Sequence, residues 1–93
     1  MGVVVTSLDP SRPFQKECKT LDINAHGCGV IVGQSLPNGT PVGVELQSSR
    51  NHTNGRIVVS LPLGDDRTMW LLGIEFESAG NFWGIQEPPP DWL

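Results

Sequence analysis

The sequence predicts an all-β protein, a small six-stranded antiparallel β-barrel, and three observations support this fold class. The 11 glycines and 8 prolines among 93 residues interrupt the chain often, so long helices are not expected. Between these interruptions lie short segments rich in β-branched residues, and the clearest of them alternate apolar and polar side chains. Short strands of this kind must close on themselves or cover their edges, which a small β-barrel or a β-sandwich achieves.

The first half of the chain is expected to form a strand, a loop and a hairpin. Residues 3–6 are largely β-branched, and residues 8–13 contain two prolines that end this strand. Strands are expected over residues 14–23 and 28–32, because the string Asn24-Ala25-His26-Gly27 between them favours a tight turn. Cys28 should then lie opposite Ile23 or Asp22, which leaves Cys18 too far away for a disulfide.

The second half is expected to contribute three more strands. Residues 42–47 alternate apolar and polar side chains and form the clearest half-buried strand of the chain. Residues 48–55 are polar and should form an exposed connection to a strand over residues 56–61. After a turn at residues 64–67, the last strand should lie in the middle of the core, with a buried face made of Trp70, Leu72, Ile74 and Phe76.

The end of the chain has a different pattern. Residues 79–85 include aromatic side chains without alternation, and residues 88–90 are consecutive prolines, which exclude a helix or an interior strand. We expect one short C-terminal helical turn and then an extended, proline-rich tail over residues 87–93. Residues 1–93 are therefore predicted to form a single domain with its core over about residues 3–86.

Length and charge exclude several classes of protein. A chain of 93 residues is too short for a large enzyme. The 10 acidic and 6 basic residues give a net charge of -4, the wrong sign for general binding of a nucleic acid polymer. No apolar stretch approaches the roughly 20 residues that span a bilayer, so membrane insertion is not expected. The two cysteines and the lack of a leader pattern favour a cytoplasmic, reduced protein.

Candidate catalytic and metal-binding residues do not form a recognisable pattern. Cys18, Cys28, His26 and His52 are the residues that could supply a nucleophile, a base or metal ligands. They lack the paired spacing of structural zinc sites, and a cysteine in a strand is usually a small buried residue. We therefore expect no catalytic residue, no metal and no cofactor, and a protein that is not an enzyme.

The most distinctive local string is Asp22-Ile23-Asn24-Ala25-His26-Gly27, at the corner between two predicted strands. The carboxylate of Asp22, the amide of Asn24 and the bare backbone of Gly27 could surround a ligand that forms hydrogen bonds. The alternative is an Asx-type turn, which needs these residues only for its own geometry. From the residues alone, the turn is the favoured interpretation.

With this string in place, the sequence resembles the PilZ domain family, small bacterial β-barrels associated with binding the second messenger cyclic di-GMP. The family's second ligand motif is Asp or Asn, any residue, Ser, any two residues, Gly, and residues 22–27 match it with Asn24 in the serine position. The order of the other segments also agrees, from Thr20-Leu21 through residues 36–40 and 55–59 to residues 70–76. The ending over residues 81–92 resembles a PilZ-like subgroup of acidobacterial type. The resemblance covers about residues 3–92 and implies that Asp22, Asn24 and Gly27 form a cyclic di-GMP motif.

One departure from the family pattern bears directly on the ligand. The family carries Arg-x-x-x-Arg before its first strand, whereas here a strand begins near Val3 and Arg12 stands alone after it. Such arginines would bind phosphates and stack on guanine, and a hydrogen bond to a charged group contributes about 1.5–3 kcal/mol. Losing both arginines would reduce affinity roughly 10²–10⁴-fold.

The sequence therefore predicts a non-enzymatic PilZ-like bacterial signalling module that is degenerate for cyclic di-GMP and acts through protein–protein interaction. Cyclic di-GMP is expected to bind weakly if at all. The competing hypothesis is a genuine cyclic di-GMP receptor domain whose arginine motif lies upstream of this sequence. The aromatic tail around Trp92 is a candidate surface for a protein partner, although packing against its own barrel is the favoured expectation.

Overall fold

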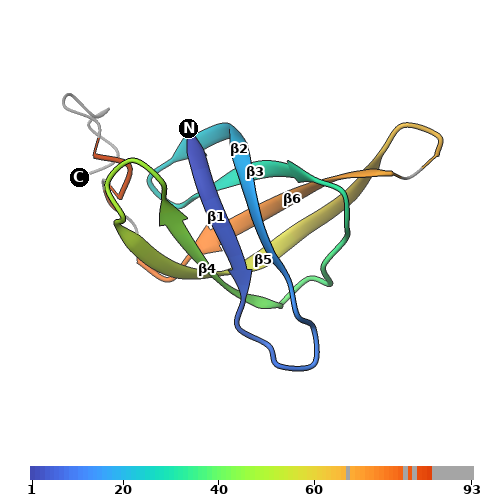
Figure 1. Ribbon diagram of the computed structural model, residues 1–93, viewed down its shortest axis with the longest axis horizontal. Helices are drawn as coiled ribbons and strands as arrows, with labels where there is room; N and C mark the ends of the chain where they lie inside the picture. The colour runs from blue at the N-terminus through green and yellow to red at the C-terminus, as the bar shows by residue number, and fades with distance from the viewer. Residues whose placement is uncertain (67, 79, 81, 85–93) are drawn as a thin grey trace.

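The computed structural model describes residues 1–66, 68–78, 80 and 82–84, which form a closed antiparallel β-barrel (Figure 1). Its strands are β1 (Gly2–Ser7), β2 (Gln15–Asn24), β3 (Gly27–Val32), β4 (Pro41–Leu46), β5 (His52–Leu63) and β6 (Met69–Phe76). The order around the barrel is β1-β2-β3-β6-β5-β4, and pairing of β1 with β4 closes it. The predicted fold class, a six-stranded antiparallel barrel, is confirmed.

The interior of the barrel is filled by the apolar side chains on one face of each alternating strand. β6 lies between β3 and β5, and its residues Leu72, Ile74 and Phe76 are buried as predicted, whereas Trp70 is only half-buried. The aliphatic side chains with no exposed surface are Val3, Val5, Val30, Val42, Val44, Ile57 and Leu72. Burying side chains of this size stabilises the fold by about 1.5–3 kcal/mol each.

β5 and β6 form a long hairpin that extends to one side of the barrel (Figure 1). β4 pairs with β5 only from His52 to Arg56, whereas β6 pairs with β5 along nearly its whole length. The register of the β5–β6 ladder shifts between Ile57 and Val59. This bulge leaves both Val58 and Val59 on the outer surface of the sheet.

The predicted exposed connection over residues 48–55 is wrong in its second half. β5 begins at His52, and its first residues pair with β4, with Thr53 opposite Val44 and Gly55 opposite Val42. The interior positions of this part of β5 are therefore filled by a threonine and a glycine rather than by large apolar residues. The apolar alternation that marks the other strands is absent here for that reason.

The segment after β6 packs against the end of the barrel. Phe82 and Trp83 form a turn, and the described part of the chain contains no helix. The buried ring of Trp83 lies 5.6 Å from the ring of Phe76 and 5.1 Å from that of Phe82, measured between centroids. The other residues of the predicted helical turn and the predicted tail with Trp92 lie outside the described residues.

Within the described ranges, no helix has the length and apolar character needed to cross a bilayer.

Candidate functional site

The β2–β3 hairpin places Asp22 and Asn24 of the predicted motif on the outer surface at one end of the barrel, whereas Gly27 is buried. Asn24 lies opposite Gly27, and Asp22 lies opposite Gly29. Ile23 lies opposite Cys28, as predicted, and these two side chains face the core. A register shift between Thr20 and Asp22 keeps Asp22 on the outer face beside the exposed Leu21.

Asn24 holds the turn together. Its Oδ1 accepts a hydrogen bond from the backbone N–H of His26 at 2.8 Å, which is the Asx-type turn expected as the alternative to a ligand motif. Its backbone carbonyl accepts a second hydrogen bond, from the indole Nε1 of Trp83 at 2.9 Å. The Asn24 side-chain oxygen is therefore already occupied by the turn.

Gly27 is required by the close approach of two strands. A Cβ at this position would overlap the carbonyl oxygen of Ile74 and would lie 3.2 Å from the Cα of Glu75. Both contacts are to the backbone of β6, which cannot move aside without breaking the ladder. The structure thus explains this glycine by strand packing.

A groove of about 320 Å³ lies next to the motif on the outer face of β2, β3, β6 and β5. Gly29 of β3 lies opposite Gly73 of β6, and Gly73 lies opposite Val59 of β5. The row Asp22, Gly29, Gly73, Val59 therefore crosses four neighbouring strands with two bare backbone positions in its centre. We call this hollow the glycine groove.

The glycine groove is lined by both polar and apolar side chains. Asn24, His26 and Glu75 line it near the β2–β3 turn. Its apolar lining includes Leu71 and three exposed aliphatic residues: Leu21, which is 64% exposed, and Val58 and Val59, each 37% exposed. Exposed apolar side chains that gather around a hollow are typical of a binding surface.

The carboxylate of Asp22 folds over the bare backbone of Gly29. A methyl group at Gly29 would lie 2.6 Å from Asp22 Oδ1 and 3.6 Å from Leu71 Cδ1. A carboxylate oxygen and an aliphatic methyl thus face each other across one glycine. Within the described ranges, Asp22 forms no ion pair and accepts no side-chain or turn hydrogen bond.

Basic side chains are scarce around the glycine groove. No lysine or arginine is among the described residues that line it. The nearest arginine in the ladder is Arg56, which lies opposite Glu75 and forms an ion pair with it at 2.9 Å. The second carboxylate of the groove is therefore already paired with a cation.

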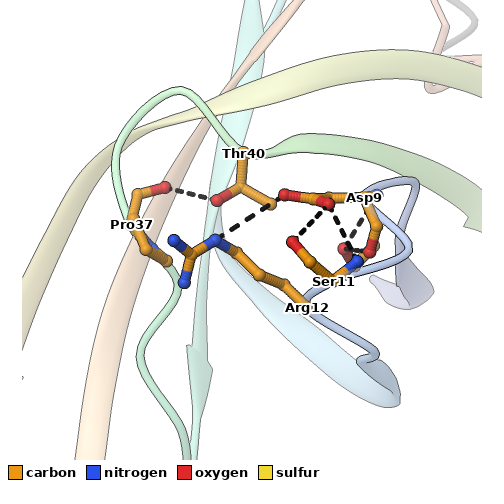
Figure 2. Close-up of polar contacts among 6 residues, drawn as sticks. Asp9, Ser11, Arg12, Pro37 and Thr40 are labelled. Atoms are coloured by element: carbon orange, nitrogen blue, oxygen red, sulfur yellow. Dashed lines mark hydrogen bonds and ion pairs between the residues drawn. The ribbon is translucent and has the colours of Figure 1, made fainter.

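Arg12 lies far from the glycine groove. It belongs to the β1–β2 loop, at the opposite end of β2 from the β2–β3 turn (Figure 1). Figure 2 shows its guanidinium directed at Asp9, with a separation of 3.6 Å between Nε and Oδ2. The side-chain and backbone hydrogen bonds from Ser11, with the charge of Arg12, hold the pKa of Asp9 below its usual value. Arg12 therefore stabilises its own loop.

The two cysteines are free thiols, and the barrel interior suppresses their reactivity. Burial raises the pKa of the Cys28 thiol to about 12, with smaller contributions from Cys18 and Asp22. Burial also raises the pKa of Cys18. His52 lies on a different part of the barrel, opposite Glu45 of β4. In the described part of the chain, no three potential ligands gather to hold a metal ion.

The sequence pattern identified only one side of the glycine groove. Asp22, Asn24 and Gly27 were candidates, whereas Gly29, Gly73, Val59 and Glu75 were not. One signal was present, because Gly73 interrupts the apolar run from Met69 to Ile74, and such a glycine often marks a close approach to its backbone.

Comparisons of this chain with protein-family models, with curated proteins and with solved structures found no match. Its function is therefore inferred from the barrel and the glycine groove.

Proposed function

We propose that this chain is a non-enzymatic PilZ-like signalling module that acts through protein–protein interaction and is degenerate for cyclic di-GMP. The observation that carries this proposal is the composition of the glycine groove. Two carboxylates and a set of exposed aliphatic side chains surround a bare backbone floor, with no lysine or arginine among the described lining residues. Such a surface favours an apolar or cationic partner over an anionic one.

Two features support a PilZ-like module. The described residues form the closed antiparallel barrel that the family resemblance implies. Asp22 and Asn24, the polar residues of the matched motif, lie on the same outer face beside one groove.

The negative charge of the groove disfavours the binding of a dinucleotide that carries two phosphates. Asp22 and Glu75 place negative charge at its rim, and Arg56 is engaged by Glu75. A phosphate entering the groove would approach the carboxylate of Asp22, and the described residues that line the groove include no lysine or arginine to compensate that charge. Affinity for cyclic di-GMP should therefore be low.

The thiols do not support covalent catalysis. A thiolate is the reactive form of cysteine, and a thiol with a pKa of about 12, as for Cys28, stays protonated near neutral pH. A role in binding therefore fits this chain better than catalysis of a hydrolysis reaction by its cysteines.

Isothermal titration calorimetry with cyclic di-GMP tests the proposal. We expect no binding at micromolar concentrations of the dinucleotide. Binding at that level, abolished by Asp22→Ala and retained by the remote charge variant Asp65→Ala, would overturn the degenerate-site proposal. Asp65 is a matched control because it is an exposed aspartate in the β5–β6 turn.

The joint placement of Asp22 and Asn24 favours one competing function, a cyclic di-GMP receptor completed by an upstream arginine motif. Fusing a short segment with Arg-x-x-x-Arg ahead of Met1 tests it. A gain in affinity of about 10²-fold or more, dependent on both arginines, would support the receptor. Unchanged affinity would favour the protein-interaction module.

A further inference from the structure

We infer that the glycine groove binds an extended peptide segment of a partner protein in which an arginine or lysine stands next to an aliphatic residue. This inference rests on the proposed function as a protein-interaction module and names the chemistry of the partner. It is carried by the position of Asp22 relative to the apolar wall of the groove.

Asp22 provides the charge complementarity. Its carboxylate lies over Gly29 without an ion-pair partner among the described residues, whereas Glu75 is already paired with Arg56. A carboxylate next to apolar side chains is stabilised by an arginine or lysine whose charged head group donates hydrogen bonds to it. An anionic partner would meet repulsion at the same point.

The apolar side chains of the groove, Leu71 and Val59, can contact the methylene stem of a basic side chain and an aliphatic residue next to it. Leu71 lies across Gly29 from Asp22, and Val59 lies over Gly73, where a Cβ would be 3.0 Å from the Cβ of Val59. Lysine and arginine bury their methylene stems on apolar surface while the charged head stays at a polar rim. An adjacent aliphatic side chain would cover the exposed Val58 and Val59 of β5.

The dimensions of the groove favour an extended segment. The row from Asp22 to Val59 crosses β2, β3, β6 and β5. Three spacings of about 4.8 Å between neighbouring strands give about 14 Å, which is the length of about four extended residues. A short linear segment can cover this distance without a folded interface.

Charge disfavours a second copy of this chain as the occupant. The chain has a net charge of -4, and Asp22 and Glu75 line the groove. Two such surfaces facing each other would bring like charges together. A basic segment of another protein removes this repulsion.

Titration of the ¹⁵N-labelled chain with short peptides, followed by NMR, tests the inference. The probes are acetylated, amidated Ser-Leu-Arg-Leu-Ser, its acidic counterpart Ser-Leu-Glu-Leu-Ser and its apolar-depleted counterpart Ser-Ser-Arg-Ser-Ser. We expect saturable shifts of the Gly29, Gly73 and Val59 amides with the first peptide. The acidic counterpart should bind about 10-fold or more weakly, because the charge-assisted contact to Asp22 is lost. The apolar-depleted counterpart should also bind more weakly.

Two variants of the groove and two matched controls sharpen the test. Asp22→Asn removes the charge at nearly constant shape, and Gly29→Ala displaces the carboxylate, which can move because it is the end of a flexible side chain. Both variants should bind the arginine peptide about 10-fold more weakly than the parent chain does. Asp65→Asn and Gly33→Ala should leave its affinity unchanged, because Asp65 and Gly33 do not line the groove. Dispersed spectra establish that each variant is folded.

The inference would be overturned by equal binding of the arginine and glutamate peptides, by shifts confined to another face, or by equal losses of affinity in the groove and control variants. Cyclic di-GMP added to the same sample separates this inference from the proposed function. Micromolar binding of the dinucleotide at the groove would overturn the proposed function itself. Absence of both peptide and dinucleotide binding would overturn only the basic–aliphatic chemistry of the partner.

Discussion

The indole Nε1 of Trp83 donates a hydrogen bond to the backbone carbonyl oxygen of Asn24 at 2.9 Å, across 59 residues of sequence. The backbone N–H of Gly80 donates to the carbonyl of Ala25 at 3.0 Å, and that of Phe76 donates to the carbonyl of His26 at 2.7 Å. The last residue of β6 and the segment that follows it thus satisfy three consecutive carbonyls of the β2–β3 turn. This arrangement holds the turn that presents Asp22 and Asn24.

Replacing Trp83 with phenylalanine should destabilise the protein by about 1–3 kcal/mol, because the carbonyl of Asn24 loses its hydrogen-bond partner and a smaller ring replaces the buried indole. Urea denaturation measures the free energy of unfolding. Hydrogen exchange should show a selective loss of protection at the amides of the β2–β3 turn. Trp70→Phe is the control, because the Trp70 indole is half-buried and makes no hydrogen bond to a described residue. Equal losses for the two variants would contradict a specific role for Trp83.

Gly27→Ala should lower stability by about 1–3 kcal/mol, because the added methyl group would overlap the backbone of β6 at Ile74. Gly33→Ala is the matched control, since the nearest atom to its Cβ would be the Thr68 carbonyl oxygen at 3.7 Å. Thermal and urea unfolding of the two variants provide the comparison. If Gly27→Ala were as stable as the parent chain, this glycine would serve the groove and not the packing of β3 on β6.

The Cys28 thiol should make stability fall at alkaline pH. Its pKa is raised from 9.0 to about 12 in the folded protein, so the unfolded chain loses the proton first as the pH rises. The contribution of this thiol is therefore complete below about pH 9 and is lost between about pH 9 and pH 12. Urea unfolding at pH 7 and at about pH 11 measures the fall.

Cys28→Ala supplies the control for this alkaline effect. The variant should be less stable at neutral pH, because a buried side chain is shortened, but it should show a smaller fall between the two pH values. An unchanged fall would assign the effect to other titrating groups. In the parent chain, a thiol reagent near neutral pH should modify Cys18 before the more deeply buried Cys28.

The ion pair between Arg56 and Glu75 should contribute little to stability. Its side chains are 62% and 50% exposed, so water screens the attraction. A double-mutant cycle with Arg56→Gln and Glu75→Gln should give a coupling of about 0.2–1 kcal/mol. The coupling should shrink further at about 1 M salt. A coupling above this range that is insensitive to salt would show that the pair is less accessible to solvent than its geometry indicates.

Much of the barrel was predictable because its signals are local. Alternation identified the strand over residues 42–47 and most of the buried face of β6. The string at residues 24–27 identified the turn and left Ile23 or Asp22 as the partner of Cys28, of which the structure has Ile23. The start of β5 was missed because its interior positions are Thr53 and Gly55, which carry no apolar signal. The pattern at Asp22 and Asn24 identified one side of the candidate site.

The sequence by itself determined the class of the fold, the places where the chain turns and the acidic character of the protein, because strand periodicity, turn chemistry and composition act over a few residues. Only the tertiary structure decided that the glycine groove exists. Gly29 and Gly73 become neighbours through the β3–β6 ladder. Asp22 of β2 and Val59 of β5 lie in the same row because the β2–β3 and β5–β6 ladders each contain a register shift. The register between strands distant in sequence depends on how their buried faces pack together, so no local pattern can specify it.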